Sequence, residues 1–168
     1  MTPQLRKSLW NQFGASIDML TNAISSYPEN LWYEQKKFFY ISYHVAVFLD
    51  YYITIPAATL SSPLPFTLSD DIPADGIDDI VPDKIYSKEE ILAYIASSRK
   101  KSQELILNMT EVDFATLWTE IESDKVMPVF ELFLYNMRHV QHHTAQLNMI
   151  LRKETGSAPG WIRYAEHQ

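Results

Sequence analysis

The chain has 168 residues, a net charge of −7 and no cysteine. A chain of this length suits one hydrophobic core, so we expect a single domain over residues 1–168. The absence of cysteine excludes a disulfide framework, a thiolate zinc site and a cysteine nucleophile. An acidic chain is poorly suited to bind nucleic acid or an anionic membrane surface, so we expect neither as a partner.

The sequence shows no pattern typical of export or of membrane insertion. Residues 1–12 include two basic side chains, but no apolar segment follows them. No stretch approaches the roughly 18 uncharged apolar residues that a membrane span requires. Together with the absence of cysteine, this pattern predicts a cytoplasmic protein.

Two long helices are expected in the first third of the chain. From about Thr2 to Ser26, apolar residues recur every three or four positions and form one helical stripe, namely Trp10, Phe13, Ile17, Leu20 and Ile24. Pro3 suits the first turn of this helix, and Pro28 marks its end. From about Leu31 to Ile55 the apolar runs are continuous rather than alternating, and their length favours a buried helix over a strand.

An acidic and proline-rich segment follows these two helices. Residues 38–83 contain no lysine or arginine, seven of the 21 acidic residues and five of the nine prolines. Proline at this density cannot continue a helix, so we predict one irregular connection over about residues 56–86. We expect its acidic side chains to be solvated, to overhang one end of the helices and to disfavour anionic substrates.

Two further helices are expected in the second half of the chain. The first begins with a capping box of Ser87 and Glu90 and ends near residues 108–110. The second extends from about Pro128 to Lys153 and is stopped by Gly156. Four helices of about 20–25 residues predict an all-α four-helix bundle, with the proline-rich segment as a crossover connection between the second and third.

Three histidines lie in positions from which they can meet. His139 and His143 are four residues apart, which places both imidazoles on one helix face, one turn apart. His44 lies near the middle of the second helix, and the three rings converge if that helix neighbours the last one. Three neutral imidazoles without a thiolate suit Zn²⁺ or Ni²⁺ and leave a coordination position open for water or substrate.

The same histidines have simpler interpretations, which the sequence leaves open. A pair at this spacing is more often solvated or hydrogen-bonded, and a single buried histidine is more often a satisfied core residue. His142 lies about 100° around the helix from His143 and is expected to take no part. His167 belongs to the C-terminal tail.

Several other residues are candidates for the surroundings of the histidines. Two tyrosines one or two turns from His44 are candidates to line a pocket, and two amides on the last helix are candidates to orient the imidazoles: Tyr40, Tyr51, Asn136 and Gln146. For each of them, simple packing or contact with solvent is the alternative. The basic run of residues 99–101 is expected to be a solvated helix face.

The arrangement resembles the DinB-like/YfiT-like superfamily of metal-dependent proteins. The likeness covers almost the whole chain. Its motifs are a histidine in the second helix, the pair His139-x-x-x-His143, the Ala-Gln-Leu segment at 145–147, the His-His doublet at 142–143 and the Pro-Gly-Trp ending at 159–161. Two residues depart from the usual pattern: Ala145 replaces a glycine, and Thr144 replaces a commonly basic residue. The resemblance implies a four-helix bundle with a metal held by His44, His139 and His143.

The resemblance also implies an activity. Members of the family include enzymes of metal-assisted hydrolysis and transferases that use a low-molecular-weight thiol in stress and detoxification. We therefore predict an enzyme acting on a small molecule. The alternative is a non-catalytic metal-binding or structural homodimer in a stress response, in which the apolar stripes of the first and fourth helices form a self-complementary interface.

Overall fold

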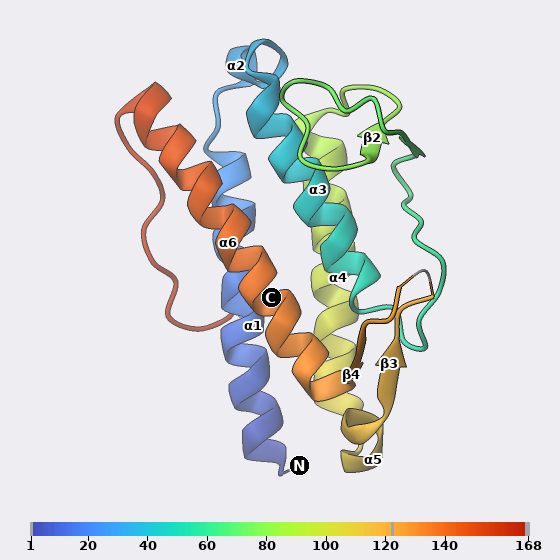
Figure 1. Cartoon of the computed structure of the whole chain (residues 1–168). Coiled ribbons are helices and arrows are strands. Elements are labelled where there is room, and N and C mark those ends of the chain that lie inside the picture. Colours follow the sequence, from blue (N-terminus) through green and yellow to red (C-terminus); the bar gives the residue numbers. More distant parts are fainter. Residues whose placement is uncertain (1, 122, 167–168) are drawn as a thin grey trace.

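The computed structural model describes residues 2–121 and 123–166 and is mostly helical, as the sequence predicts. The helices in the described residues are α1 (Pro3–Ser25), α2 (Glu29–Glu34), α3 (Lys36–Tyr51), α4 (Lys88–Asn108), α5 (Glu111–Ala115) and α6 (Val129–Thr155). Figure 1 shows the four long helices lying side by side, with α2 and α5 at opposite ends. Among the described helices, none has the length and apolar character needed to cross a membrane.

Two short antiparallel strand pairs were not predicted. In the connection between α3 and α4, β1 (Phe66–Leu68) pairs with β2 (Ile80–Pro82). Before α6, β3 (Leu117–Thr119) pairs with β4 (Val126–Pro128). A strand of three residues is too short to show an alternating apolar pattern. The prolines of these segments indicate an irregular chain and so give no sign of a strand.

The helix ends agree with the signals in the sequence. The Thr2 side chain accepts a hydrogen bond from the Leu5 N–H at the start of α1. At the start of α4, the Ser87 hydroxyl accepts from the Glu90 N–H, and the Glu90 carboxylate accepts from the Ser87 N–H at 2.6 Å. α6 ends at Gly156, whose φ of 79° is accessible to glycine without strain.

The predicted second helix is interrupted and shorter than expected. Gln35, with φ −102° and ψ 71°, separates α2 from α3, and α3 ends at Tyr51 rather than near residue 55. The buried Trp32 of α2 donates its indole N–H to the Tyr86 carbonyl at 2.9 Å. This contact joins residues 54 apart in the sequence and holds α2 over the start of α4. It outweighs the continuous apolar pattern, which predicted one unbroken helix.

The directions of the helices explain the long connection. α1 and α3 each lie against both α4 and α6. α3 and α4 run in the same direction, since Tyr43 stacks on Tyr86 just before α4, and Asp50, later in α3, pairs with Lys101, later in α4. The chain must therefore return along the length of α3 before α4 begins, and residues 52–87 follow that path at the side of the two helices (Figure 1).

The core is built mainly from aromatic and branched aliphatic side chains of the long helices. The α1 stripe is 0–5% exposed, comprising Trp10, Phe13, Ile17, Leu20 and Ile24. Burial of side chains of this size contributes about 1.5–3 kcal/mol each. Because this stripe is buried within the chain, it offers no free surface to a second copy, and the homodimer stays a prediction without that support.

Arg99 is buried, contrary to the solvated helix face expected from the basic run. Its guanidinium donates to both carboxylate oxygens of Asp18, at 2.6 and 3.1 Å, and to the Glu166 carbonyl at 2.8 Å. The Glu166 N–H donates in turn to Asp18 at 2.8 Å, which fixes the C-terminal segment against α1 and α4. The prediction was wrong because the partner, Asp18, is distant in the sequence. His167 lies outside the described residues.

Candidate metal centre

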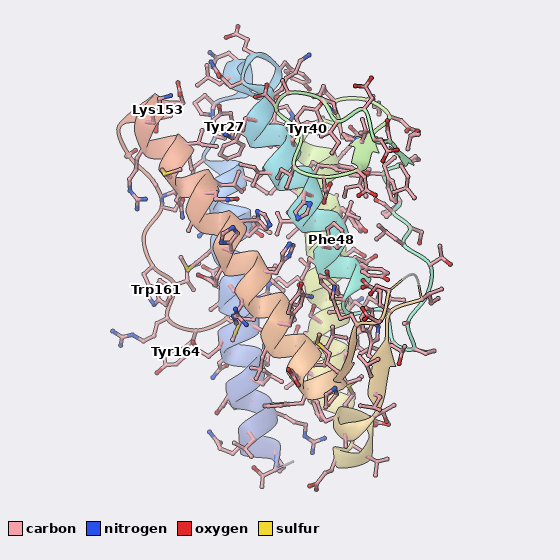
Figure 2. The ribbon with its side chains drawn as sticks, in the orientation of Figure 1. Tyr27, Tyr40, Phe48, Lys153, Trp161 and Tyr164 are labelled. Carbon is pink, nitrogen blue, oxygen red and sulfur yellow. The ribbon has the colours of Figure 1, made fainter. Side chains whose placement is uncertain are left out.

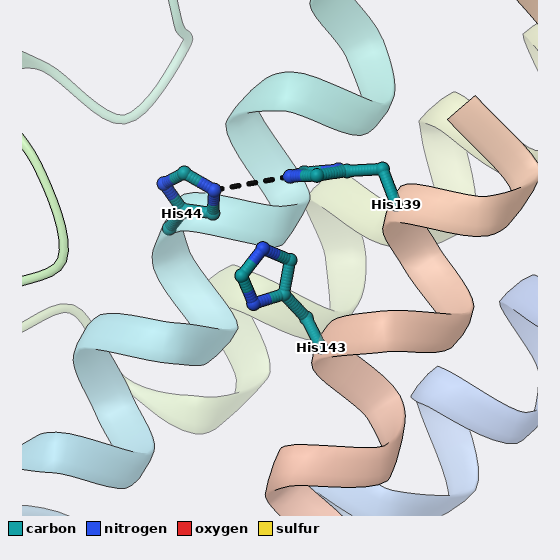
Figure 3. A group of neighbouring side chains, drawn as sticks. All are labelled: His44, His139 and His143. Atoms are coloured by element: carbon teal, nitrogen blue, oxygen red, sulfur yellow. Dashed lines mark hydrogen bonds between the residues drawn. The ribbon is translucent and has the colours of Figure 1, made fainter. Parts of the chain in front are cut away.

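The three histidines meet between α3 and α6. His44 comes from α3, while His139 and His143 come from successive turns of α6, and Figure 3 shows the three rings turned towards one another. The Nε2 atoms of His44 and His139 are 3.1 Å apart. One ring nitrogen from each histidine lies within 4.8 Å of the other two.

Two of these nitrogens are spaced as ligands of a tetrahedral ion. Imidazole nitrogens bind zinc at about 2.0–2.1 Å, so two of them at a tetrahedral angle are about 3.3 Å apart. The separation of 3.1 Å between His44 and His139 is close to that value. Three imidazoles with no thiolate are a donor set that suits Zn²⁺ or Ni²⁺.

The centre favours neutral imidazoles, whose lone pairs are free to bind a cation. Burial, and then the neighbouring His143 and His44, lower the pKa of the His139 imidazole to about 3. Burial is also the largest cause that lowers the pKa of His143 to about 4, followed by the charge of His44. Both side chains are therefore neutral near pH 7, which is the form that ligates metal.

Gln146 orients one of the rings. Its side-chain oxygen lies 2.8 Å from Nδ1 of His143, and its amide nitrogen lies 3.2 Å from Nε2 of His142. Because an amide oxygen only accepts hydrogen bonds, Nδ1 of His143 carries the proton and Nε2 keeps its lone pair. The structure thus places Gln146 where the sequence suggests, and leaves His142 at the exposed edge of the centre.

A model of the DinB superfamily matches residues 12–147, a span that includes all three histidines. The chain belongs to the DinB superfamily. The match confirms the resemblance read from the histidine pattern. Searches of curated proteins and of solved structures gave no match.

Asp78 is a residue of this DinB-superfamily site that sequence reasoning missed. Its Oδ2 atom lies 2.5 Å from Nδ1 of His44, an electrostatic contact without hydrogen-bond geometry. Its Oδ1 atom accepts from the Ile80 N–H at 3.3 Å, which ties the carboxylate to the start of β2. A carboxylate behind a ligating imidazole holds the ring and raises its basicity.

Aromatic rings cover the centre on the α3 side. The Phe48 ring lies 4.7 Å from the His44 ring and 5.8 Å from the His139 ring, measured between centroids. The Tyr52 ring lies 6.0 Å from the His139 ring, edge-on. Phe48 follows His44 by one helical turn, so the sequence carried a signal that helical spacing alone would have revealed.

Of the other three candidates, Tyr51 packs edge-on against Phe48 beside the centre, at 6.1 Å between ring centroids, while Tyr40 contacts Phe39 and Asn136 contacts Leu49. Tyr40 lies edge-on to Phe39 towards the α2 end of α3, further up the helix than Phe48 (Figure 2). Tyr51 lies edge-on to Trp118, at 5.7 Å between ring centroids. Asn136 is buried and donates to the Leu49 carbonyl at 3.0 Å, so it joins α6 to α3 one turn from the centre.

Proposed function

We propose that this DinB-superfamily protein holds a divalent metal ion, Zn²⁺ or Ni²⁺, at His44, His139 and His143, within a four-helix bundle whose 56–86 segment is the crossover connection. The observation that carries the proposal is the convergence of three ring nitrogens, one from each histidine, within 4.8 Å. A metal bound by three protein ligands lowers the pKa of a water or thiol in its open position. The corresponding activity is hydrolysis, or transfer of a low-molecular-weight thiol, on a small molecule.

The neighbouring residues support this role in distinct ways. Gln146 holds the proton of His143 on Nδ1, away from the centre. Asp78 faces the outer nitrogen of His44 and places a negative charge behind that ring. Phe48 and Tyr52 limit the access of water from the α3 side, which strengthens electrostatic interactions at the histidines. Gln146 and Asp78 thus hold the two rings that face His139.

Metal content of the protein, purified without a histidine tag, is the direct test. After supplementation with Zn²⁺ or Ni²⁺, we expect about one ion per chain in the wild type, as three protein ligands provide one site. His139→Ala should lose the ion, while the matched control His142→Ala, at the exposed edge of the centre, should keep it. Circular dichroism checks that both variants are folded.

The outcomes separate the functions still open. A wild-type protein that carries no metal after supplementation contradicts the proposal. A protein that binds metal but shows no turnover with hydrolysable esters and amides, or with thiols and electrophiles, is the non-catalytic metal-binding protein. The homodimer and the cytoplasmic location stay predictions, and analytical ultracentrifugation tests the first of them.

A further inference from the structure

The outer side of α6 carries a cavity that reaches the histidine centre. It has a volume of about 600 Å³ and is lined by Tyr135, Arg138, His139, Gln141 and His142. A cavity of this size lies in the range that binds small molecules. Because His139 belongs both to this cavity and to the centre, a molecule seated here lies beside the proposed metal site.

The cavity lining is rich in hydrogen-bond donors and has no carboxylate among the described residues. Its side chains include a guanidinium, an amide, a phenol and two imidazoles. Arg138 is exposed and forms neither an ion pair nor a hydrogen bond with any described residue. In a chain with net charge −7, a lining whose described residues include an unpaired guanidinium and no carboxylate favours an anion locally.

The cations and anions around the centre are divided between its two sides. Lys125 lies 5.4 Å from the Tyr135 ring centroid, but its charge is matched by Glu120 at 3.3 Å. Arg138 is therefore the unmatched cation in the lining of the cavity at His139. On the opposite side, Asp78 faces His44. A ligand entering at His139 meets positive charge, and the carboxylate of the connection lies behind the centre.

We propose that Arg138 binds a carboxylate of the substrate while the reacting group of that substrate lies at the three histidines. This assignment rests on the proposed function and specifies its substrate class. A guanidinium pairs with a carboxylate through two parallel N–H donors. One unmatched positive charge fits a single carboxylate better than a doubly charged phosphate. The assignment reverses the expectation that the acidic connection disfavours anionic substrates.

The test uses protein loaded with Co²⁺, because thiolate binding to this ion changes its visible spectrum. The probes are 3-mercaptopropionate and its neutral analogue 3-mercaptopropionamide, which carry the same thiol. We expect wild-type protein to bind the acid about three- to tenfold more tightly than the amide, the range between an exposed ion pair and a charge-assisted hydrogen bond. Arg138→Gln should remove this preference without changing the affinity for the amide.

Arg152→Gln is the matched control. Arg152 lies on the same helix, 14 positions further along, which is about 21 Å at 1.5 Å per residue. This variant should keep the preference for the acid. Equal affinities of wild type and Arg138→Gln for the acid, in protein with unchanged cobalt content, overturn the assignment to Arg138 alone. A wild-type protein that binds no cobalt overturns the metal centre and this substrate assignment with it.

Discussion

Polar side chains are buried at two contacts between long helices, which we call the α1–α4 seam and the α3–α6 seam. The two seams differ in how far these side chains are hydrogen-bonded. At the α1–α4 seam, both oxygens of Asp18 and two nitrogens of Arg99 have hydrogen-bond partners. At the α3–α6 seam, three imidazoles face one another, and the buried Nδ1 atom of His139 has no hydrogen-bond partner. The first seam completes its own hydrogen bonding, while the second leaves one buried ring nitrogen of His139 unpaired and pairs the other only with Nε2 of His44.

This difference separates a structural polar cluster from a ligand site. A buried polar group without a hydrogen-bond partner lowers the stability of the folded state by about 1–3 kcal/mol. Nδ1 of His139 is such a group, and it stabilises nothing in the fold itself. A cation bound between Nε2 of His44 and Nε2 of His139 would replace their mutual hydrogen bond, a replacement that the fully paired Asp18–Arg99 cluster does not offer. Substitution at the α1–α4 seam should therefore lower the stability of the protein whether or not metal is present. Substitution at the α3–α6 seam should mainly remove the stabilisation that metal gives.

Breaking the ion pair at the α1–α4 seam should have the largest effect on stability. Asp18→Asn leaves the charge of Arg99 buried without a counter-charge, and we expect a loss of about 3–5 kcal/mol in the free energy of unfolding. Replacing both residues by apolar ones, as Asp18→Leu with Arg99→Met, should recover part of this loss, because the N–H and carbonyl of Glu166 then lose their partners. Urea unfolding with EDTA present measures both values.

The control for this prediction is Asp50→Asn. Asp50 pairs with Lys101, whose side chain is 39% exposed, so the expected loss is below about 1 kcal/mol. Metal content should be the same in all these variants, because none of the substituted residues contacts the histidines. Loss of metal in Asp18→Asn that is still folded would mean that the two seams are not independent.

Metal should stabilise the α3–α6 seam alone. At a free concentration one hundred times Kd, a ligand that binds only the folded state adds about 2.7 kcal/mol to the free energy of unfolding. We expect this gain in wild type and its absence in His139→Leu. Without metal, the variant should be within about 1 kcal/mol of wild type, since it removes a buried unpartnered nitrogen and also the hydrogen bond between Nε2 of His139 and Nε2 of His44. Thermal unfolding with and without added Zn²⁺ makes the comparison.

Local spacing predicted the helices and the shared face of His139 and His143, because both depend on neighbours along one helix, whereas His44 joins them only because α3 packs against α6. The ends of α1, α4 and α6 follow from caps a few residues long, and the spacing of His139 and His143 gives their shared face. Local spacing did not reveal the break at Gln35, because the hydrogen bond between Trp32 and Tyr86 that holds α2 in place joins distant parts of the chain.

Asp78 was missed for a related reason. The connection between α3 and α4 carries six aspartates, namely Asp70, Asp71, Asp75, Asp78, Asp79 and Asp83. Nothing in their spacing distinguishes the one that reaches His44, because an irregular segment has no period from which to infer a face. The burial of Arg99 was missed in the same way, since its partner lies on another helix.

Removing the carboxylate behind His44 should weaken the centre without removing it. Asp78→Asn keeps the shape of the side chain but removes the negative charge that faces Nδ1 of His44. We expect metal affinity to fall about 10- to 100-fold, the usual effect of losing a partner behind a ligating imidazole. Competition with a chromophoric chelator measures this Kd. Asp79→Asn, the exposed neighbour, is the control and should bind metal as wild type does.

The smallest effect is expected at Gln146, where the orienting group is neutral. Gln146→Met keeps the length of the side chain but removes the oxygen that lies 2.8 Å from Nδ1 of His143. Because a neutral hydrogen bond contributes about 1 kcal/mol, we expect affinity to fall about fivefold. Gln141→Met serves as the control, since the Gln141 side chain contacts Met19 rather than an imidazole. A loss at Gln146 as large as at Asp78 would show that fixing the proton position, rather than the charge behind the ring, determines metal affinity.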